Sequence, residues 1–431
     1  LALMDEHVSA FKRFRREKAI AKKEAKRLID EIIATRVIRF RLKDRHVSEL
    51  RLWSGEVNFL WNYCNDLGDK VYQREHRFLH KFEYAQYTKG AGQAGLHLHS
   101  QTIQAVSEEF ATRRQQFGKV KLQWRKSKGV RRSLGWIPIK ASALTYRAGQ
   151  LWVSGMEYQT TSTFDHHLGV PEQRLEGKKK PLSLWDSHGL ATLLKENPNA
   201  LGTSTISEDS RGRWYINITV KVPKKPKMNP ADPSAPISGI GIDLGLKDLA
   251  SMSDGKKADI QHFYRDAEAK LAIAQRANKK DRVKAIHAQI ANRRKDYHHK
   301  LSTDLVSRYC AIFVGNVSAS GLAKTTMAKS VLDAGWSMLR TMLLYKCADA
   351  GRWFDEVNES FTTQDCSACS TYENGVYKPV RSGPKGLKDL GIREWTCHCC
   401  GAHHDRDTNA AKNIFARGHA RLAGGIPVLT A

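Results

Sequence analysis

The segment ISGIGIDLGLKDLASMSDG (residues 237–255) decides the fold of the second half of this chain. It consists of an apolar strand that ends near Asp243, a glycine-rich bend and a second strand. A basic helical hairpin over 258–309 follows it. Next come a buried strand at 310–315, an amphipathic helix over 327–351 that ends at Gly351, and a strand at 352–360. This order of strands and helices predicts an α/β domain.

The first half has a different pattern, which indicates a β module with a helical insertion. A strand is predicted at 36–43, helices at 46–75 and 99–118, and hairpins at 143–155 and 202–222. Five prolines within 223–236 predict a linker to the second half. Residues 3–34 are rich in Ala, Glu, Lys and Arg, which predicts either a helix that binds RNA or a solvated extension.

The composition favours a polyanionic partner. Lys and Arg number 71 against 44 Asp and Glu in 431 residues, a net charge of +27. Such an excess is typical of proteins that bind nucleic acid phosphates, although generic basic surfaces are an alternative. The sequence has neither an apolar run of about 18 residues nor the pattern of a signal peptide. We therefore expect a cytosolic protein without membrane association.

Five of the eight cysteines lie between 366 and 400, in two CxxC pairs. Pairs at this separation are typical of a structural zinc ribbon with four thiolate ligands, Cys366, Cys369, Cys397 and Cys400. Cys399 falls inside the second pair, and the spacing leaves it outside the ligand set. The remaining three, Cys64, Cys310 and Cys347, have apolar neighbours and are expected to be core thiols.

Acidic residues at element ends suggest a second kind of metal site. Asp243 follows an apolar strand, and Asp405 and Asp407 lie at a helix start in HDRDTNAAKNI (404–414). Each alone is more often a turn former or a helix cap. Together they suggest a divalent cation site, because Mg²⁺ prefers carboxylates and water.

Several stretches carry a family resemblance: GIDLGLKDLA, NRRKDYHHKLST, AKSVLDAGWSMLR, TTQDCSAC and WTCHCCGAHHDRDTNAAKNI. They resemble TnpB, the RNA-guided nuclease of bacterial insertion sequences and a relative of the compact type V CRISPR effectors. The resemblance is strong over 237–418 and loose over 36–235, and it does not extend to residues 1–34.

The resemblance implies an α/β plus β-barrel, multidomain fold. The implied parts are an N-terminal charged helical extension (1–35), a split β-barrel wedge domain (36–51 and 135–222), a helical recognition domain (52–134), a linker (223–236), an RNase H-like RuvC nuclease domain (237–360 and 405–418), an inserted zinc ribbon (361–404) and a C-terminal tail (419–431). It also implies a guide RNA from the transposon end, a double-stranded DNA target with a short adjacent motif, two catalytic Mg²⁺ ions and one structural Zn²⁺. A member of this family is expected in the bacterial cytoplasm, associated with the nucleoid.

The resemblance places the first catalytic acid at Asp243 and the third at Asp407, with Asp405 as a cap or support. The second acid of the family is a strand-end Glu, but in IFVGNVSAS (312–320) that position is Gly315, followed by Asn316. We expect Glu359, at the end of the neighbouring strand, to replace it in the space that glycine leaves. Glu356 is the weaker choice, because strand alternation points it to the opposite face.

These features define three functional hypotheses. The first is an RNA-guided DNA endonuclease, the second an RNA-guided DNA-binding regulator whose site has lost activity, and the third a basic zinc-ribbon protein that binds nucleic acid without a guide. The 258–300 hairpin is expected to follow the RNA, and the 370–396 segment to form either a lid or a surface loop. Phosphate contacts are weaker predictions for Lys324, Lys329 and Arg340, each of which also suits a solvated face.

Overall fold

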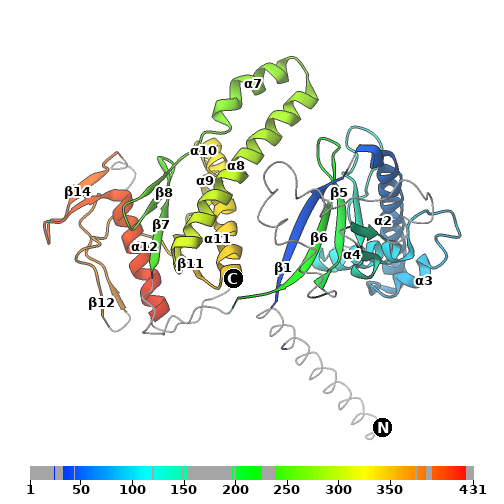
Figure 1. The fold of residues 1–431 in the computed structure, drawn as a ribbon, viewed down its shortest axis with the longest axis horizontal. Helices are drawn as coiled ribbons and strands as arrows, with labels where there is room; N and C mark the ends of the chain where they lie inside the picture. Colours follow the sequence, from blue (N-terminus) through cyan, green and yellow to red (C-terminus); the bar gives the residue numbers. More distant parts are fainter. Residues whose placement is uncertain are drawn as a thin grey trace, which may run out of the picture. The chain divides into compact units, whose positions relative to one another are not determined.

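The computed structural model of this chain describes residues 24, 33–42, 44–118, 121–147, 150–153, 197, 200–225, 238–373, 376–384 and 391–423. Residues Ile33–Val222 form one compact unit, and a second unit includes the chain from Pro223 onward (Figure 1). The boundary coincides with the start of the proline-rich segment predicted as a linker. Most of that segment, and the predicted N-terminal helix apart from Glu24, lie outside the described residues.

The first unit contains a four-stranded sheet in the order β1-β6-β5-β2. Its strands are β1 (Ile33–Arg41), β2 (Trp136–Ile139), β5 (Ser204–Glu208) and β6 (Trp214–Pro223). The antiparallel β5–β6 pair confirms the predicted 202–222 hairpin, and β3 (Leu144–Arg147) with β4 (Gln150–Val153) confirms the 143–155 hairpin. In the described part of the unit the strands form an open sheet and a separate hairpin, so the barrel stays a prediction.

The helices of this unit, α2 (Val47–Glu75), α3 (Tyr84–Thr88) and α4 (Ser100–Phe117), share one hydrophobic core with the sheet. Burial alternates along β5 and β6, which places Ile206, Ile216 and Ile218 against apolar helix residues such as Leu50 and Phe110. The helices and strands therefore stabilise each other, and the predicted boundary between wedge and recognition domains stays a prediction.

The second unit is built on a five-stranded sheet in the order β11-β10-β7-β8-β9. Its strands are β7 (Gly239–Leu244), β8 (Asp248–Met252), β9 (Lys257–Asp259), β10 (Ala311–Gly315) and β11 (Trp353–Val357). The first three are antiparallel, and β10 runs parallel to both β7 and β11. All five residues of β10 are buried, as expected for a central strand covered on both faces. The predicted α/β pattern is confirmed.

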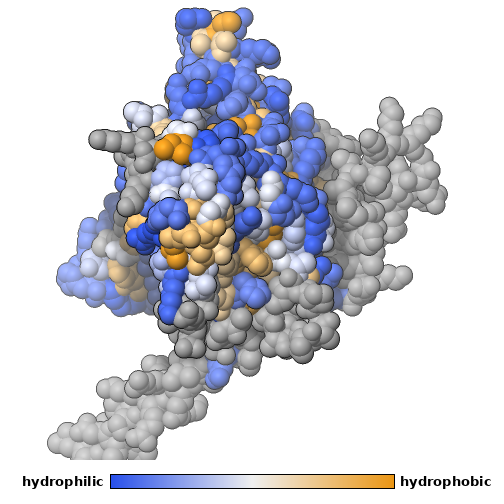
Figure 2. Space-filling model, turned by 90° about the vertical axis from the view of Figure 1, so that its left-hand side faces the viewer, coloured by the Kyte–Doolittle hydropathy of each residue, from blue (hydrophilic) through white to orange (hydrophobic). Residues whose placement is uncertain are grey.

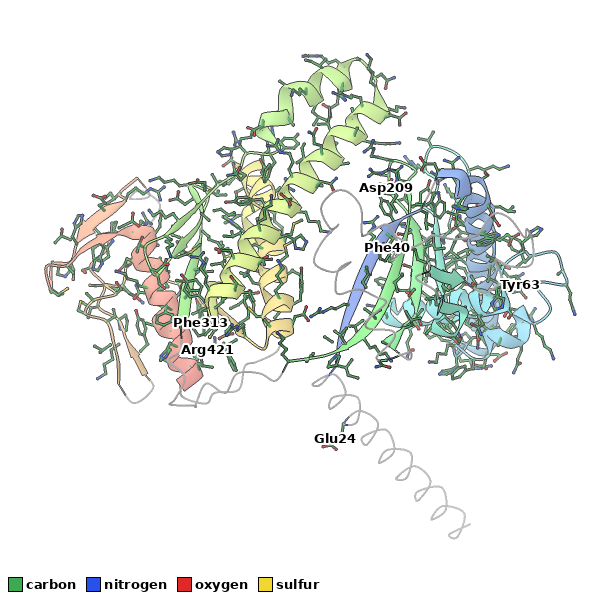
Figure 3. All side chains as sticks on the ribbon, in the orientation of Figure 1. Glu24, Phe40, Tyr63, Asp209, Phe313 and Arg421 are labelled. Atoms are coloured by element: carbon green, nitrogen blue, oxygen red, sulfur yellow. The ribbon has the colours of Figure 1, made fainter. Side chains whose placement is uncertain are left out.

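Helices cover both faces of this sheet. Ile312 and Val314 of β10 pack with residues of α11 (Trp336–Ala350), including Leu339 and Leu343. Phe313 points to the opposite face, where its ring lies 6.0 Å from that of Phe415 on α12 (Arg406–Ala423) (Figure 3).

The glycine at position 241 has no side chain and lets α12 approach the sheet closely. A Cβ on Gly241 would overlap the Ala411 carbonyl oxygen and the backbone of Phe415. The start of α12 is thereby held close to the strand that carries Asp243.

Two predicted elements differ from the structure. The single helix predicted over 327–351 is broken into α10 (Ala328–Ala334) and α11 at Gly335, whose φ of 67° is left-handed. The Nε2 of the buried His298 lies 3.0 Å from the Ala334 carbonyl oxygen, so this backbone carbonyl has a hydrogen-bond partner at the break. The strand predicted over 352–360 ends at Val357, and the final residues form a turn.

The basic hairpin consists of α7 (Arg265–Arg276) and α8 (Lys280–Arg308), with three and eight Lys or Arg residues respectively. It confirms the predicted hairpin, except that it begins after β9. Figure 2 shows the helices that project at the top of the view covered mostly by hydrophilic residues. Within the described residues, none of the helices is long and apolar enough to cross a membrane.

The region between β11 and α12 contains two short antiparallel pairs. These are β12 (Thr371–Glu373) with β13 (Val376–Lys378), and β14 (Glu394–Thr396) with β15 (His403–Asp405). Cys366 and Cys369 precede β12, and Cys397 and Cys400 lie in the loop between β14 and β15. A short helix, α9 (Ala319–Leu322), follows β10.

Candidate metal centres

Three carboxyl groups from separate segments lie where β10 and β11 end, and those of Glu359 and Asp407 are close enough to Asp243 to affect its titration. They belong to Asp243 on β7, Glu359 beyond β11 and Asp407 at the start of α12. The pKa of Asp243 is raised well above its ordinary value, first by burial and then by the negative charges of Glu359 and Asp407, while Arg406 opposes the shift. A carboxyl held beside two others in a desolvated place is suited to bind a cation.

Glu359 occupies the space that Gly315 leaves open. A Cβ on residue 315 would lie 2.5 Å from the Glu359 Oε2 and 3.4 Å from its Cβ. Burial raises the pKa of Glu359, against the nearby charge of Arg340 and a hydrogen bond from the Val317 backbone. The geometry is the one that the sequence predicted for a relocated acid, and the catalytic role of Glu359 remains a prediction.

Asn316 contributes to this arrangement in a way that sequence reasoning missed. Its side-chain Oδ1 accepts a hydrogen bond from the Glu359 backbone N–H at 3.3 Å. An uncharged acceptor next to the glycine was the only signal for it in the sequence. Gly315 and Asn316, which look like a lost acidic pair, both accommodate Glu359.

Glu356 is the exposed residue of β11. Its carboxylate is exposed and pairs with Arg340, with Nη1 and Oε2 3.0 Å apart. Asp355, on the other face of β11, is buried and pairs with Arg421 on α12 at 3.0 Å. Strand alternation separates Glu356 from Asp355, as the sequence predicted, but it does not extend to Glu359, which lies beyond the end of β11.

Asp405 and Asp407 have different environments although they are two residues apart. Asp405 caps α12, because the Thr408 backbone N–H donates to its Oδ1 at 2.8 Å, and Lys257 Nζ lies 2.9 Å from its Oδ2. Burial opposes ionisation of Asp405, but these contacts lower its pKa below the usual value. Asp407 lies near Arg393, with Nη1 and Oδ2 3.4 Å apart. The predicted capping role of Asp405 is confirmed.

The basic residues proposed as phosphate contacts are placed unevenly. Arg340 lies close enough to influence Glu359, whereas Lys329 is engaged with Glu268 in an exposed pair at 2.7 Å. Lys324 is exposed, and it has no ion pair with the described residues. Arg340 is thus the one of the three that lies beside the acidic cluster.

The four predicted cysteine ligands converge, with all four Sγ atoms within 4.8 Å of one another. Tetrahedral zinc with Zn–S bonds of about 2.3 Å places its sulfur ligands about 3.8 Å apart. The observed separations are 3.7 Å for Cys366 and Cys400 and 3.8 Å for Cys369 and Cys397, so the thiols fit this ion. Cys399 is exposed and lies outside the set.

Neighbouring groups support the thiol cluster. The Ser382 hydroxyl donates to Cys397 Sγ at 2.9 Å, and this contact with nearby backbone amides lowers the pKa of Cys397 to about 5. The His404 Nε2 lies 3.0 Å from Cys366 Sγ. Of the predicted core thiols, Cys64 and Cys347 are buried and Cys310 is partly exposed.

In the described residues no other group of three or more possible ligands gathers as tightly as the four thiols. The three carboxylates form a wider cluster.

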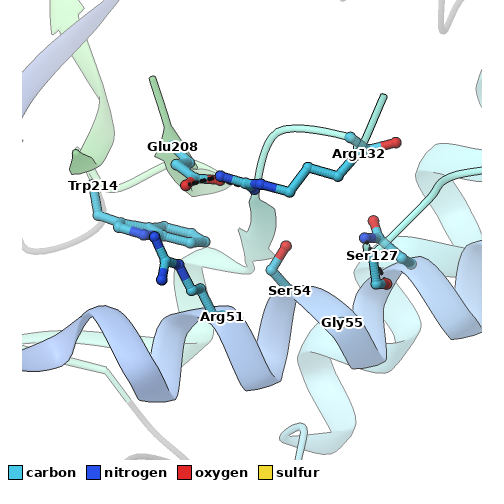
Figure 4. Close-up of a pocket in the computed structure, with 9 residues that line it drawn as sticks. Arg51, Ser54, Gly55, Ser127, Arg132, Glu208 and Trp214 are labelled. Atoms are coloured by element: carbon cyan, nitrogen blue, oxygen red, sulfur yellow. Dashed lines mark hydrogen bonds and ion pairs between the residues drawn. The ribbon is translucent and has the colours of Figure 1, made fainter. Parts of the chain in front are cut away.

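The first unit contains a pocket of about 310 Å³ whose lining includes two arginines, one glutamate and Trp214 (Figure 4). Its lining comprises Arg51, Ser54, Gly55, Asn58, Ser127, Arg132, Ser133, Glu208 and Trp214. The fully buried Glu208 accepts two hydrogen bonds from Arg132, both at 2.6 Å, and one from the Gly135 N–H at 3.0 Å. Since this carboxylate is already satisfied, the pair mainly fastens the loop before β2 to the end of β5.

Two family models match the second half of the chain. A model described as "Probable transposase" matches residues 217–326, and one described as "Cas12f1-like, TNB domain" matches residues 336–414. These matches confirm the resemblance to TnpB-like proteins. They cover the five-stranded sheet, the thiol cluster and the start of α12.

Curated relatives carry related names. A putative RNA-guided DNA endonuclease of Streptomyces pristinaespiralis is 37% identical over 237 residues, which are 52% of this chain and 54% of the relative. InsQ of Escherichia coli K12, also named a putative RNA-guided DNA endonuclease, is 30% identical over 51% of this chain and 58% of its own length. The Cas12f1 endodeoxyribonuclease of Sulfoacidibacillus thermotolerans is 24% identical over 48% and 51%. The chain spans about half the length of the curated relatives it matches.

A solved structure shares the fold. The protein in a cryo-EM structure of a Cas12f1–sgRNA–target DNA complex superposes with a TM-score of 0.51 at 13% identity, over 86% of this chain and 83% of that one. The likeness at this identity concerns the fold.

Proposed function

We propose that this chain is an RNA-guided DNA endonuclease that hydrolyses phosphodiester bonds at Asp243, Glu359 and Asp407. The observation that carries the proposal is the fit of Glu359 into the space above Gly315, which brings a third carboxylate to Asp243 and Asp407. A site that had lost its activity would not need to retain a glycine at that position. The names of the curated relatives support the same activity.

The strand order and directions of the second unit support an RNase H-like, RuvC-type nuclease domain. In such sheets acidic residues from separated segments meet at one edge, as Asp243, Glu359 and Asp407 do here. When bound, two Mg²⁺ ions stabilise the attacking and leaving oxygens of phosphodiester hydrolysis. The three carboxylates would supply the negative charge that holds the ions. The pKa of Asp243 is raised first by burial and then by the charges of Glu359 and Asp407, and bound cations would neutralise those charges.

The partners are proposed to be a guide RNA from a transposon end and a double-stranded DNA target. Base pairing with the guide would read the target sequence, while the protein reads a short adjacent motif. The net charge of +27 and the basic α7–α8 hairpin support contact with phosphates. One structural Zn²⁺ on the four thiols would hold the ribbon between β11 and α12.

The test is cleavage of a plasmid library with a randomised target-adjacent motif. The complex is purified with RNA transcribed from the DNA flanking its own gene, and cleavage is measured with Mg²⁺ and with EDTA. We expect guided, Mg²⁺-dependent cutting that Glu359→Gln abolishes without loss of guided binding. The matched control Glu356→Gln, three residues away, should cut normally.

Two other outcomes would point to the alternatives. Guided binding without cutting by the wild-type complex would replace the endonuclease with an RNA-guided DNA-binding regulator. Purification without RNA of defined length, together with DNA binding that ignores the guide, would favour an unguided zinc-ribbon protein. Normal cutting by Glu359→Gln would refute the proposed second acid.

A further inference from the structure

Glu359 lies in a turn that the sheet does not hold. The β10–β11 ladder ends at the pair Gly315 and Val357, and the Asn316 N–H donates the last backbone bond to the Val357 carbonyl at 3.0 Å. Beyond it, the Glu359 carbonyl accepts hydrogen bonds from the backbone N–H and the hydroxyl of Thr362, at 3.1 and 2.8 Å. The position of the carboxylate therefore depends on contacts made by this turn.

The turn contains a strained residue. Phe361 has a φ of 65°, in the left-handed region that aromatic residues rarely adopt, and its side chain is 48% exposed. Such a conformation costs about 1–3 kcal/mol and persists where surrounding contacts impose it. The Arg381 guanidinium stacks on the ring, 3.7 Å from its centroid. Strain at this point indicates that other groups hold the turn in place.

Arg417 on α12 holds the turn on both sides of Glu359. Its Nη1 donates to the Asn358 carbonyl at 2.8 Å and to the Ser360 carbonyl at 2.9 Å. These are the residues immediately before and after Glu359. A planar guanidinium is suited to this task, because its donors have fixed directions that a lysine ammonium lacks.

Asp365 fixes Arg417 in turn. Its fully buried carboxylate accepts from Arg417 Nη2 at 2.8 Å, from Arg381 Nε at 3.1 Å and from the Tyr377 hydroxyl at 3.2 Å. The Asn413 amide on α12 also donates to the Asp365 and Thr362 carbonyls, at 2.7 and 2.8 Å. The helix that begins with Asp407 thus also anchors the turn that carries Glu359.

We infer that Arg417 is a positioning residue for Glu359. Because Arg417 and Asp407 lie on the same helix, α12, Arg417 keeps the Glu359 carboxylate at a constant position relative to Asp407. The inference rests on the proposed nuclease site. It assigns to Arg417 a role that a strand-end acid would not need, because the ladder itself would hold such an acid. Among the described residues Arg417 has no hydrogen bond or ion pair with the carboxylates of Asp243, Glu359 or Asp407, and it acts through the backbone of the turn.

The test compares Arg417→Gln and Arg417→Lys with Arg421→Gln. Arg421 lies one helical turn later on α12 (Figure 3), where it pairs with Asp355 and donates to the Glu356 carbonyl at 3.5 Å. Within the described residues it has no hydrogen bond to residues 358–360. Amide hydrogen exchange in peptides covering 357–364 reports on the turn, and it is measured on the full chain without Mg²⁺. Single-turnover cleavage by the guided complex is measured across a Mg²⁺ titration. Melting temperature and zinc content identify variants that fail to fold.

For Arg417→Gln we expect faster exchange over 357–364 and a loss of roughly 10- to 100-fold in cleavage rate at limiting Mg²⁺, the range typical of residues that orient metal ligands. Saturating Mg²⁺ should restore part of the rate, and guided target binding should stay within about twofold. Arg417→Lys should fall between wild type and Arg417→Gln, and it replaces Arg417→Gln if the latter does not fold. Arg421→Gln should leave the exchange of this turn and the Mg²⁺ dependence unchanged.

Unchanged exchange and an unchanged Mg²⁺ dependence in a folded Arg417 variant would overturn the inference, and so would equal effects of Arg421→Gln. The proposed function fails separately, if the wild-type complex binds its target without cutting. In that case the exchange measurement still decides whether Arg417 holds the turn.

Discussion

Substitution of Gly315 by alanine is the most direct test of the acidic site, because it adds a single methyl group at the end of β10. The new Cβ would lie 2.5 Å from the Glu359 Oε2 and 3.1 Å from the Ile414 Cδ1. Ordinary van der Waals contact begins near 3.4 Å. The Glu359 oxygen must therefore retreat by the difference, about 0.9 Å, and Ile414 by about 0.3 Å.

The expected effect on stability is small. The more crowded atom is the far end of a flexible side chain, and Gly315 does not have a positive φ. Replacing glycine with alanine in an allowed conformation stabilises proteins by about 0.4–1 kcal/mol, because the unfolded chain loses freedom. This gain offsets the slight crowding of Ile414, so the free energy of unfolding should change by less than about 1 kcal/mol.

The expected effect on cleavage is large. A displacement of about 1 Å in an active site costs roughly 100-fold in rate, which corresponds to about 2.7 kcal/mol in the activation barrier. Single-turnover plasmid cleavage by the saturated complex measures this rate, and thermal unfolding and target binding are measured on the same preparation.

Either of two results would refute this reasoning. One is wild-type cleavage by a stable Gly315→Ala variant, which would show that Glu359 does not need the space. The other is a loss of thermal stability or of target binding as large as the loss of cleavage, which would show that the methyl group acts through the fold or through DNA binding.

Three further predictions concern Asp243, the thiol cluster and the packing of α12 on Gly241. The raised pKa of Asp243 means that the Mg²⁺-free fold loses stability as the pH rises above the ordinary Asp pKa. Asp243→Asn should remove this loss and raise the melting temperature at neutral pH, by about 2–4 °C for each kcal/mol of stability regained. The variant should also lose the stabilisation by Mg²⁺, and thermal unfolding across pH measures all three effects. Cys366→Ser should lower both zinc content and melting temperature, whereas the matched change Cys399→Ser should alter neither. Gly241→Ala should destabilise the chain by more than about 1 kcal/mol in denaturant unfolding, because its Cβ meets the rigid carbonyl of Ala411; an unchanged midpoint would contradict the close packing of α12.

Local pattern was sufficient for much of the fold. The alternation of β5 and β6, the fully apolar β10 and the spacing of the cysteines each depend on a short stretch, and the structure bears out all three. The break at Gly335 was not predictable in this way, since a glycine inside an amphipathic pattern is often tolerated in a helix. The contact of His298 with the Ala334 carbonyl, from a distant helix, stabilises the break.

The sequence by itself determined which kinds of residue this protein brings together: a strand that ends near Asp243, four thiols in two pairs, a helix capped by Asp405, and a glycine where an acid was expected. Only the tertiary structure decided how the gap is filled. Strand periodicity orients side chains within β11 but stops at Val357, so the position of Glu359 depends on backbone torsions in a turn. Those torsions are set by Asn316 and Arg417, which lie 43 and 58 positions away in the chain. Hydrogen bonds between such distant segments leave no periodic trace in a sequence and arise when the sheet and α12 pack together.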